Sequence, residues 1–205
     1  MINLIHGDCM KYMATLKDNE FDLAVVDPPY GIGNRTFGSN KSTKTKNSQT
    51  KYKGHKWDDH IPSQKYFDEL KRVSKHQIIW GANYFPLSQY RCFIVWDKMT
   101  YIPTMSQVEL AYTSFDSPAR YIKINSNQQN RFHPTQKPIQ LYQWIFDKYS
   151  QKGWRILDTH LGSGSSAIAA HDSGLDFVGI ELDSDYFQAA KARLEAHQRQ
   201  LSLPW

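Results

Sequence analysis

The apolar run Leu23 to Val26 leads directly into Asp27-Pro28-Pro29-Tyr30, and this junction constrains the fold more than any other stretch. The run is rich in β-branched side chains and predicts a buried strand, which two prolines without an N–H end abruptly. Asp27 and Tyr30 are therefore expected just past the carboxyl end of a strand, where open α/β sheets bind ligands. A strand with a simple proline turn is the alternative. The chemistry favours a site, because a fixed acceptor and a flat ring suit a planar group bearing an NH₂, such as a nucleobase edge.

Length and composition restrict the class of protein. A chain of 205 residues with 40% hydrophobic residues predicts one folded domain, residues 1–205, rather than a disordered chain. Two cysteines are too few for a disulfide scaffold and favour a reducing, cytoplasmic location. The N-terminus has no signal-peptide pattern, and no apolar run approaches the ~18 residues of a membrane span, so no membrane partner is expected.

Apolar patterning predicts alternating strands and helices, which is typical of an α/β fold. Besides the strand before Asp27, strands are expected at 2–5, 77–80, 93–96, 110–115, 119–122, 155–158 and 177–183. Those at 110–115 and 119–122 are candidate antiparallel partners. Helices are expected at 10–16, 63–73, 139–149 and 185–198, with another ending at 171.

A basic segment follows the Asp27 turn. Seven positive residues and no Asp or Glu lie between residues 31 and 56, whereas the whole chain carries only +5. The positive residues are Arg35, Lys41, Lys44, Lys46, Lys51, Lys53 and Lys56. A solvated surface insertion would explain them. Their place on a loop that leaves the candidate site, at about residues 31–60, favours contact with a phosphate backbone.

A glycine-rich loop marks a second candidate site. Gly162-x-Gly164-x-x-Ala167 lies between a predicted strand and a predicted helix, and Glu181 closes the next strand, as in nucleotide-binding fingerprints. An NAD-dependent dehydrogenase is disfavoured because only about 40 residues follow the loop, too few for a Rossmann domain that starts there. The nucleotide-binding half must therefore be permuted to the C-terminal end. The scattered histidines support no metal site.

Taken in order, these motifs resemble the β class of DNA amino-methyltransferases, the N6-adenine and N4-cytosine family. Asp27-Pro28-Pro29-Tyr30 is similar to the catalytic motif of that family, and Asp158 to Ser165 is similar to its D-P-F-x-G-S-G-T cofactor loop. His133 to Pro138 resembles the segment before that loop, and Gly7-Asp8-Cys9 resembles the adenine-side contact. Thr159 and His160 depart from the usual Pro and Phe of the family.

The resemblance implies a Rossmann-like methyltransferase fold, with a mostly parallel twisted sheet, helices on both faces, and the catalytic motif ahead of the cofactor loop. It implies S-adenosylmethionine as the methyl donor and double-stranded DNA as the partner, with a target-recognition region at about 97–130. A small recognition surface would gain from a homodimer. The cofactor-binding residues implied are Asp8, Cys9, Asp27, Thr135, Lys137, Asp158, Thr159, Leu161, Gly162, Ser163, Gly164 and Glu181, with Lys137 near the methionine carboxylate.

The same resemblance implies a mechanism. Asp27 and the Pro28 carbonyl would accept the hydrogens of an exocyclic amine on a flipped-out base, and Tyr30 would stack on that base. Asp at position 27 favours adenine N6, because cytosine members more often carry Ser there. The alternatives are an N4-cytosine enzyme, a silent DNA-binding relative, and an enzyme acting on RNA or on a protein amide.

Overall fold

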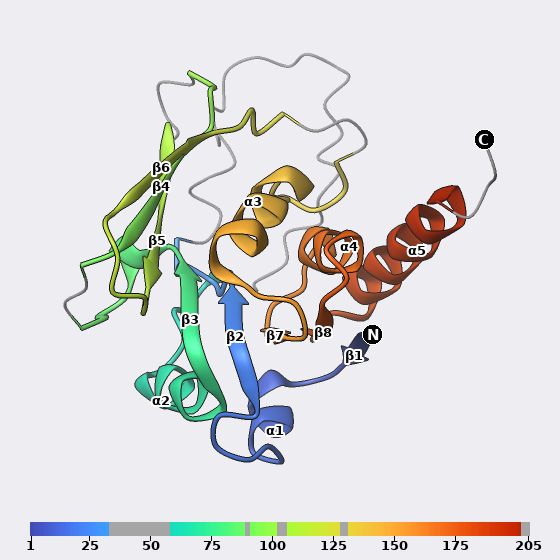
Figure 1. Ribbon diagram of the computed structural model, residues 1–205, viewed down its shortest axis with the longest axis horizontal. Helices are drawn as coiled ribbons and strands as arrows, with labels where there is room; N and C mark the ends of the chain where they lie inside the picture. Colours follow the sequence, from blue (N-terminus) through green and yellow to red (C-terminus); the bar gives the residue numbers. More distant parts are fainter. Residues whose placement is uncertain (33–57, 89–90, 102–105, 128–130, 202–205) are drawn as a thin grey trace.

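The computed structural model describes residues 1–32, 58–88, 91–101, 106–127 and 131–201 (Figure 1). Within these ranges eight strands form one sheet in the order β1-β8-β7-β2-β3-β5-β4-β6. The strands are β1 (Ile2–His6), β2 (Phe21–Val26), β3 (Ser74–Trp80), β4 (Phe93–Asp97), β5 (Val108–Thr113), β6 (Arg120–Lys123), β7 (Arg155–Asp158) and β8 (Asp176–Glu181). The helices are α1 (Cys9–Met13), α2 (Gln64–Val73), the short 3-10 helix η3 (Ala82–Tyr84), α3 (Ile139–Tyr149), α4 (Ser165–Asp172) and α5 (Ser184–Leu201).

The five strands β1, β8, β7, β2 and β3 are neighbours and all run parallel. Their carboxyl ends therefore share one edge of the sheet. Strand β5 runs antiparallel to β3 and β4, so the beginning of β5 lies at that same edge. The expected pairing of 110–115 with 119–122 was wrong, because β4 lies between β5 and β6 and pairs in parallel with β6.

Apolar side chains bury both faces of the sheet. Helices α1 and α2 cover one face, where Met13, Phe67 and Leu70 pack against residues of β2, β3 and β8. Helices α3, α4 and α5 contribute to the core of the other face, which includes Leu141, Ala167 and Ala190 (Figure 1). The sheet is thus covered on both sides, as expected for strands rich in Val, Ile and Leu.

The chain leaves β2 and β7 in opposite directions. β2 leads to β3 on one side, through α2, while β7 leads to β8 on the other side, through α4 on the opposite face. Adjacent strands whose connections diverge in this way leave a crevice at their carboxyl ends, which is the usual ligand position in open α/β sheets. The predicted fold class is therefore confirmed, including the order in which the Asp27 strand precedes the glycine-loop strand.

None of the helices in the described ranges combines the length and the apolar character needed to cross a bilayer. The same residues contain no group of three His, Cys, Asp or Glu side chains arranged to hold a metal ion.

Candidate active site

Asp27, in the turn after β2, accepts two short hydrogen bonds. The Tyr30 hydroxyl donates to Asp27 Oδ1 at 2.6 Å, and Lys137 Nζ donates to Asp27 Oδ2 at 2.6 Å. The Asp58 carboxylate closes the turn by accepting hydrogen bonds from the backbone N–H groups of Tyr30 (2.6 Å) and Gly31 (3.0 Å). Pro28 is buried and Pro29 is half-buried. Because the prolines also fix φ, the Asp27 carboxylate is held in one orientation.

The ring of Tyr30 packs between neighbouring groups at the end of β3. It stacks on Tyr84, with ring centroids 4.9 Å apart and an interplanar angle of 13°, and it meets the edge of Phe85. Gly81 has φ +76°, and a Cβ at this position would lie 2.3 Å from Tyr30 Cε1. Glycine at position 81 thus allows the Tyr30 ring to approach the backbone closely.

Lys137 sits between two carboxylates in the segment before α3. Its ammonium pairs with Asp27 and also lies 3.0 Å from Glu109 Oε2, while Lys98 Nζ lies 2.7 Å from Glu109 Oε1. The Lys137 side chain is only 3% exposed, and its Nζ lies 5.2 Å from the centroid of the Trp80 ring. The result is a buried cluster of two positive and two negative groups.

The charges of this cluster shift one another's pKa values. Burial raises the pKa of Asp27, and Lys137 opposes that rise while Glu109 adds to it. Burial also pushes the pKa of Glu109 upward, but Lys137 and Lys98 more than offset this, so that its pKa is lowered. The pKa of Lys137 is raised, because its two carboxylate partners outweigh its desolvation.

The glycine loop after β7 has the backbone geometry that its sequence predicts. Gly162 (φ +51°) and Gly164 (φ +72°) adopt left-handed conformations, and a Cβ on Gly164 would lie 3.1 Å from Ala190 Cβ. The N–H of Gly162 donates to Glu181 Oε2 at 2.8 Å, while Glu181 Oε1 accepts from the N–H of Asp183 at 2.9 Å. The carboxylate at the end of β8 is therefore fixed against the loop after β7.

Asp158 at the end of β7 is a buried carboxyl group. It accepts hydrogen bonds from the Ser166 hydroxyl at 2.6 Å and from the His160 N–H at 3.0 Å. Burial raises the pKa of Asp158 to about 7, against the lowering effect of those hydrogen bonds, and the nearby Asp27 and Glu181 carboxylates raise it further. The charge of Asp27, at the end of β2, therefore affects the pKa of Asp158, at the end of β7.

Thr159 and His160, which depart from the family pattern, are accommodated by α2. The Thr159 hydroxyl is hydrogen-bonded to the Tyr66 hydroxyl at 2.7 Å and to His160 Nδ1 at 2.9 Å. The His160 ring meets the Tyr66 ring edge-on at a centroid distance of 5.4 Å. Burial lowers the pKa of His160 to about 4, so that this imidazole is neutral near pH 7.

Asp8 caps the N-terminus of α1. Its carboxylate accepts hydrogen bonds from the N–H groups of Met10 (2.7 Å) and Lys11 (3.4 Å) at the start of α1. Cys9 follows it, and burial together with the Asp8 charge raises the pKa of its thiol to about 11. Both residues lie at the edge of the sheet that carries Asp158 and Glu181, since β1 pairs parallel with β8.

The remaining residues expected to bind the cofactor lie in the glycine loop and in the segment before α3. Leu161 and Ser163 are buried within the glycine loop. Thr135 is exposed and its hydroxyl lies 3.2 Å from His133 Nδ1. The expected position of Lys137 beside a methionine carboxylate stays a prediction, and the carboxylates that contact it in the structure are Asp27 and Glu109. The seven basic residues from Arg35 to Lys56 lie outside the described residues.

Sequence reasoning missed several residues of the site, namely Asp58, Tyr66, Tyr84, Lys98 and Glu109. Glu109 carried one signal, because it directly precedes the apolar residues of a predicted strand. Its position at the edge of the site follows from the reversed direction of β5, which the sequence does not specify.

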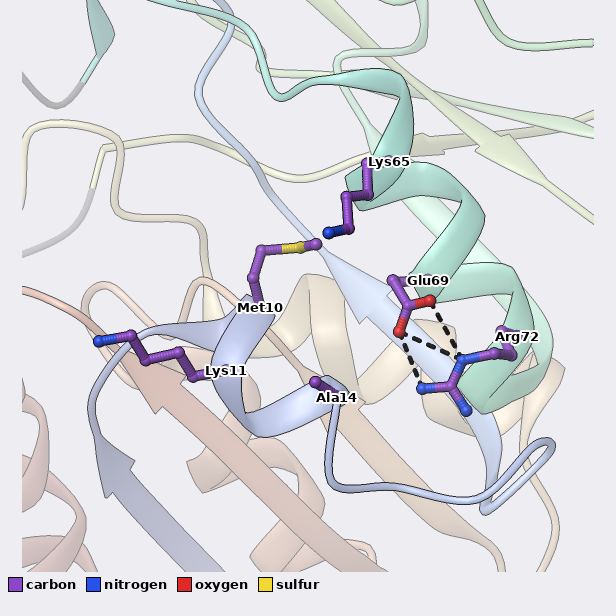
Figure 2. Close-up of a pocket in the computed structure, with 6 residues that line it drawn as sticks. All are labelled: Met10, Lys11, Ala14, Lys65, Glu69 and Arg72. Carbon is purple, nitrogen blue, oxygen red and sulfur yellow. Dashed lines mark hydrogen bonds and ion pairs between the residues drawn. The ribbon is translucent and has the colours of Figure 1, made fainter.

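A separate surface hollow lies between α1 and α2 (Figure 2). It is lined by Met10, Lys11, Ala14, Lys65, Glu69 and Arg72. The Arg72 guanidinium is already engaged by Glu69, by Asp18 and by backbone carbonyl groups of the α1 region. Its hydrogen bonds thus serve to hold the helices together.

Comparisons with known proteins bear on the family and the fold of the chain. Residues 80–192, more than half of the chain, match the family model of N6/N4 DNA methylases. The chain is 27% identical to Type II methyltransferase M2.MboI of Moraxella bovis, an alignment that covers 93% of this chain and 86% of that protein. The crystal structure of the M1.HpyAVI–SAM complex is similar, with a TM-score of 0.62 at 21% identity, covering 94% of this chain and 100% of the other. PvuII DNA methyltransferase, described as cytosine-N4-specific, has the same TM-score of 0.62 at 10% identity, covering 97% of this chain and 90% of the other. The chain belongs to the N6/N4 DNA methylase family.

Proposed function

We propose that this DNA methylase transfers a methyl group from S-adenosylmethionine to the exocyclic N6 of adenine in duplex DNA. One observation carries the proposal. The Asp27 turn follows β2, the glycine loop follows β7, and these two strands are parallel neighbours with Leu23 opposite Ile156 and Ala24 opposite Leu157. A group held by one turn therefore faces the same crevice as a group held by the other.

The residues at the edge of the sheet fit the donor molecule. Gly162 and Gly164 allow close approach to the backbone, and the carboxylates of Asp158 and Glu181 can accept hydrogen bonds from hydroxyl or ammonium groups. Asp8 and Cys9 at the end of β1 would lie on the adenine side. When bound, S-adenosylmethionine supplies a methyl group on a positively charged sulfur. The protein contributes position and orientation to the reaction.

The Asp27 turn would recognise the target amine. Asp27 and the Pro28 carbonyl accept the two amine hydrogens, which holds the nitrogen lone pair toward the methyl group. Tyr30 stacks on the flipped base, a type of contact worth roughly 1–3 kcal/mol. Flipping itself costs a few kcal/mol, so both contacts are needed to hold the base out of the duplex.

The choice of adenine rests on the carboxylate at position 27. A cytosine N4 target is the competing proposal, and the fold is shared with the cytosine-N4-specific PvuII enzyme. The test is to incubate the full chain with duplex DNA and S-adenosylmethionine, digest the DNA to nucleosides and identify the product by mass spectrometry. N6-methyladenine is expected. N4-methylcytosine would overturn the choice of base, and methylation of RNA but not of duplex DNA would overturn the substrate class.

Two further segments would contact the DNA. Residues 97–130, within which β5 and β6 lie, would contribute to target recognition, and the basic residues from Arg35 to Lys56 would contact phosphates. A homodimer would enlarge the recognition surface. Sedimentation of the protein with and without DNA tests the dimer.

A further inference from the structure

Both carboxylate oxygens of Asp27 already accept a short hydrogen bond, so a target amine that reaches this buried group must share or replace one of the two donors. Oδ1 accepts from the Tyr30 hydroxyl and Oδ2 accepts from Lys137 Nζ, each at 2.6 Å. Tyr30 is three residues away on the same turn, and its ring is held by Tyr84 and Gly81. Lys137 reaches Asp27 through a long flexible side chain from a segment 110 residues further along the chain. Of the two donors, Lys137 is therefore the one with more freedom to withdraw.

A withdrawn Lys137 ammonium needs another partner, because the side chain is 3% exposed and an unpaired buried charge is strongly destabilising. Glu109 offers such a partner. Its Oε2 lies 3.0 Å from Lys137 Nζ, yet this buried oxygen accepts no aligned hydrogen bond from any residue in the described ranges. The hydrogen bonds of Lys137 Nζ run to Asp27 Oδ2 at 2.6 Å and to the Tyr30 hydroxyl oxygen at 3.4 Å.

Glu109 is held in place independently of Lys137. Lys98 Nζ lies 2.7 Å from Glu109 Oε1, and the Lys98 N–H donates to the Gln107 carbonyl at 3.0 Å. These contacts join the end of β4 to the start of β5. Glu109 Oε2 is consequently a fixed acceptor, and it lies next to the Lys137 ammonium, which can move.

We propose that Glu109 is a positioning residue for methyl transfer: its Oε2, already 3.0 Å from the Lys137 ammonium, becomes the main partner of that ammonium when the target amine replaces it at Asp27. This inference rests on the proposed function, in which Asp27 accepts the amine. The exchange keeps every buried charge paired: Asp27 gains the amine donors, Lys137 moves to Glu109, and Lys98 stays where it is. No proton needs to be transferred in the exchange.

The test is Glu109→Gln in the full chain, assayed by labelled-methyl transfer to duplex DNA across a range of pH. We expect a kcat roughly tenfold lower, in the range of interactions between contacting residues, with unchanged affinity for S-adenosylmethionine. The acidic limb of the rate profile should move to lower pH, because the Glu109 charge raises the pKa of Asp27. Four other titratable groups interact electrostatically with Asp27, and Glu109→Gln leaves all of them in place. They are Asp58, Asp158, Tyr66 and Tyr142.

The matched control is Glu20→Gln, which removes the 2.8 Å ion pair with Arg155 at similar exposure of the glutamate, 29% against 21% for Glu109. It should leave the pH profile unchanged. A purely structural role for Glu109 would lower stability and rate without moving the acidic limb, and that result would overturn the inference.

The double variant Lys137→Gln/Glu109→Gln tests whether Glu109 acts through the Lys137 ammonium. In a Lys137→Gln background, Glu109→Gln should lower kcat no further, since no ammonium remains to be taken over, whereas independent effects would overturn the inference. Asp27→Asn separates the two claims. An inactive Asp27→Asn with a fully active Glu109→Gln would contradict only the inference, and an active Asp27→Asn would contradict the proposed function itself.

Discussion

Lys137 Nζ lies 2.6 Å from Asp27 Oδ2 and joins the segment before α3 to the turn after β2. The pair connects two of the motifs that resemble those of the family, and it is nearly closed to solvent, with the two side chains 3% and 14% exposed. The carboxylate proposed to receive the target amine is thus already paired with a buried positive charge, which opposes the rise in its pKa that burial causes.

Lys137→Gln should move the acidic limb of methyl transfer to higher pH. Burial raises the pKa of Asp27 and Lys137 lowers it, so loss of the ammonium lets that pKa rise further. Activity that needs ionised Asp27 would then require a higher pH. Lys75→Gln is the control, because it removes a 2.7 Å ion pair with Asp22 that is more exposed. An unchanged limb in Lys137→Gln would contradict the assigned electrostatic role.

Gly81→Ala should displace the Tyr30 ring. A Cβ at position 81 would lie 2.3 Å from Tyr30 Cε1, and φ is +76°, so we expect a methyl transfer rate at least about tenfold lower and a loss of roughly 1–3 kcal/mol in the free energy of unfolding. Gly174→Ala is the control, because it shares a positive φ of +66° but meets no atom within 4 Å. Gly174→Ala should lower the free energy of unfolding but leave the methyl transfer rate unchanged. Equal rates in the two variants would contradict the packing role of Gly81.

The stability of the protein without cofactor should depend on Asp158. Its folded pKa of about 7 lies above the usual value of 3.8, so the contribution of Asp158 to stability is complete below about pH 4 and is lost as pH rises through 7. Asp158→Asn should flatten this fall in the free energy of unfolding, measured by urea denaturation, and should weaken binding of S-adenosylmethionine. The exposed Asp147→Asn should retain the fall. A wild-type slope in Asp158→Asn would contradict the assignment.

Neutralising Lys51, Lys53 and Lys56 to Gln should weaken DNA binding while leaving the affinity for S-adenosylmethionine unchanged. Each phosphate contact that is lost should reduce the slope of log affinity against log salt by about 0.9. Fluorescence anisotropy with a labelled duplex at several salt concentrations measures both quantities. Replacing Lys65, Lys71 and Lys75 by Gln removes the same charge elsewhere and serves as the control. An unchanged salt slope in the first variant would contradict a role in gripping the phosphates.

The sequence predicted the strands that carry the site because local patterns determine where they end. Asp27 follows four apolar residues and precedes two prolines, and Asp158 precedes a glycine loop, so each was expected at the carboxyl end of a strand. β7 and α3 have the predicted bounds. β2 and β7 are parallel neighbours, so the two predicted strand ends lie at one edge of the sheet.

Contacts across the sheet could not be predicted in this way. Glu109 reaches Lys137 only because β5 runs antiparallel to β3 and sets Ala111 opposite Trp80, which brings the start of β5 to the edge where β3 ends. Likewise, the Tyr30–Tyr84 stack depends on the left-handed turn at Gly81. These relationships come from strand direction and register, which short-range patterns do not encode.

The most direct test of the account is Asp27→Ala, with methyl transfer from labelled S-adenosylmethionine to duplex DNA measured beside the affinity for S-adenosylmethionine. We expect that transfer is abolished while the donor still binds, because the two turns perform separate tasks at one edge of the sheet. Transfer that persists, or loss of donor binding together with transfer, would contradict it.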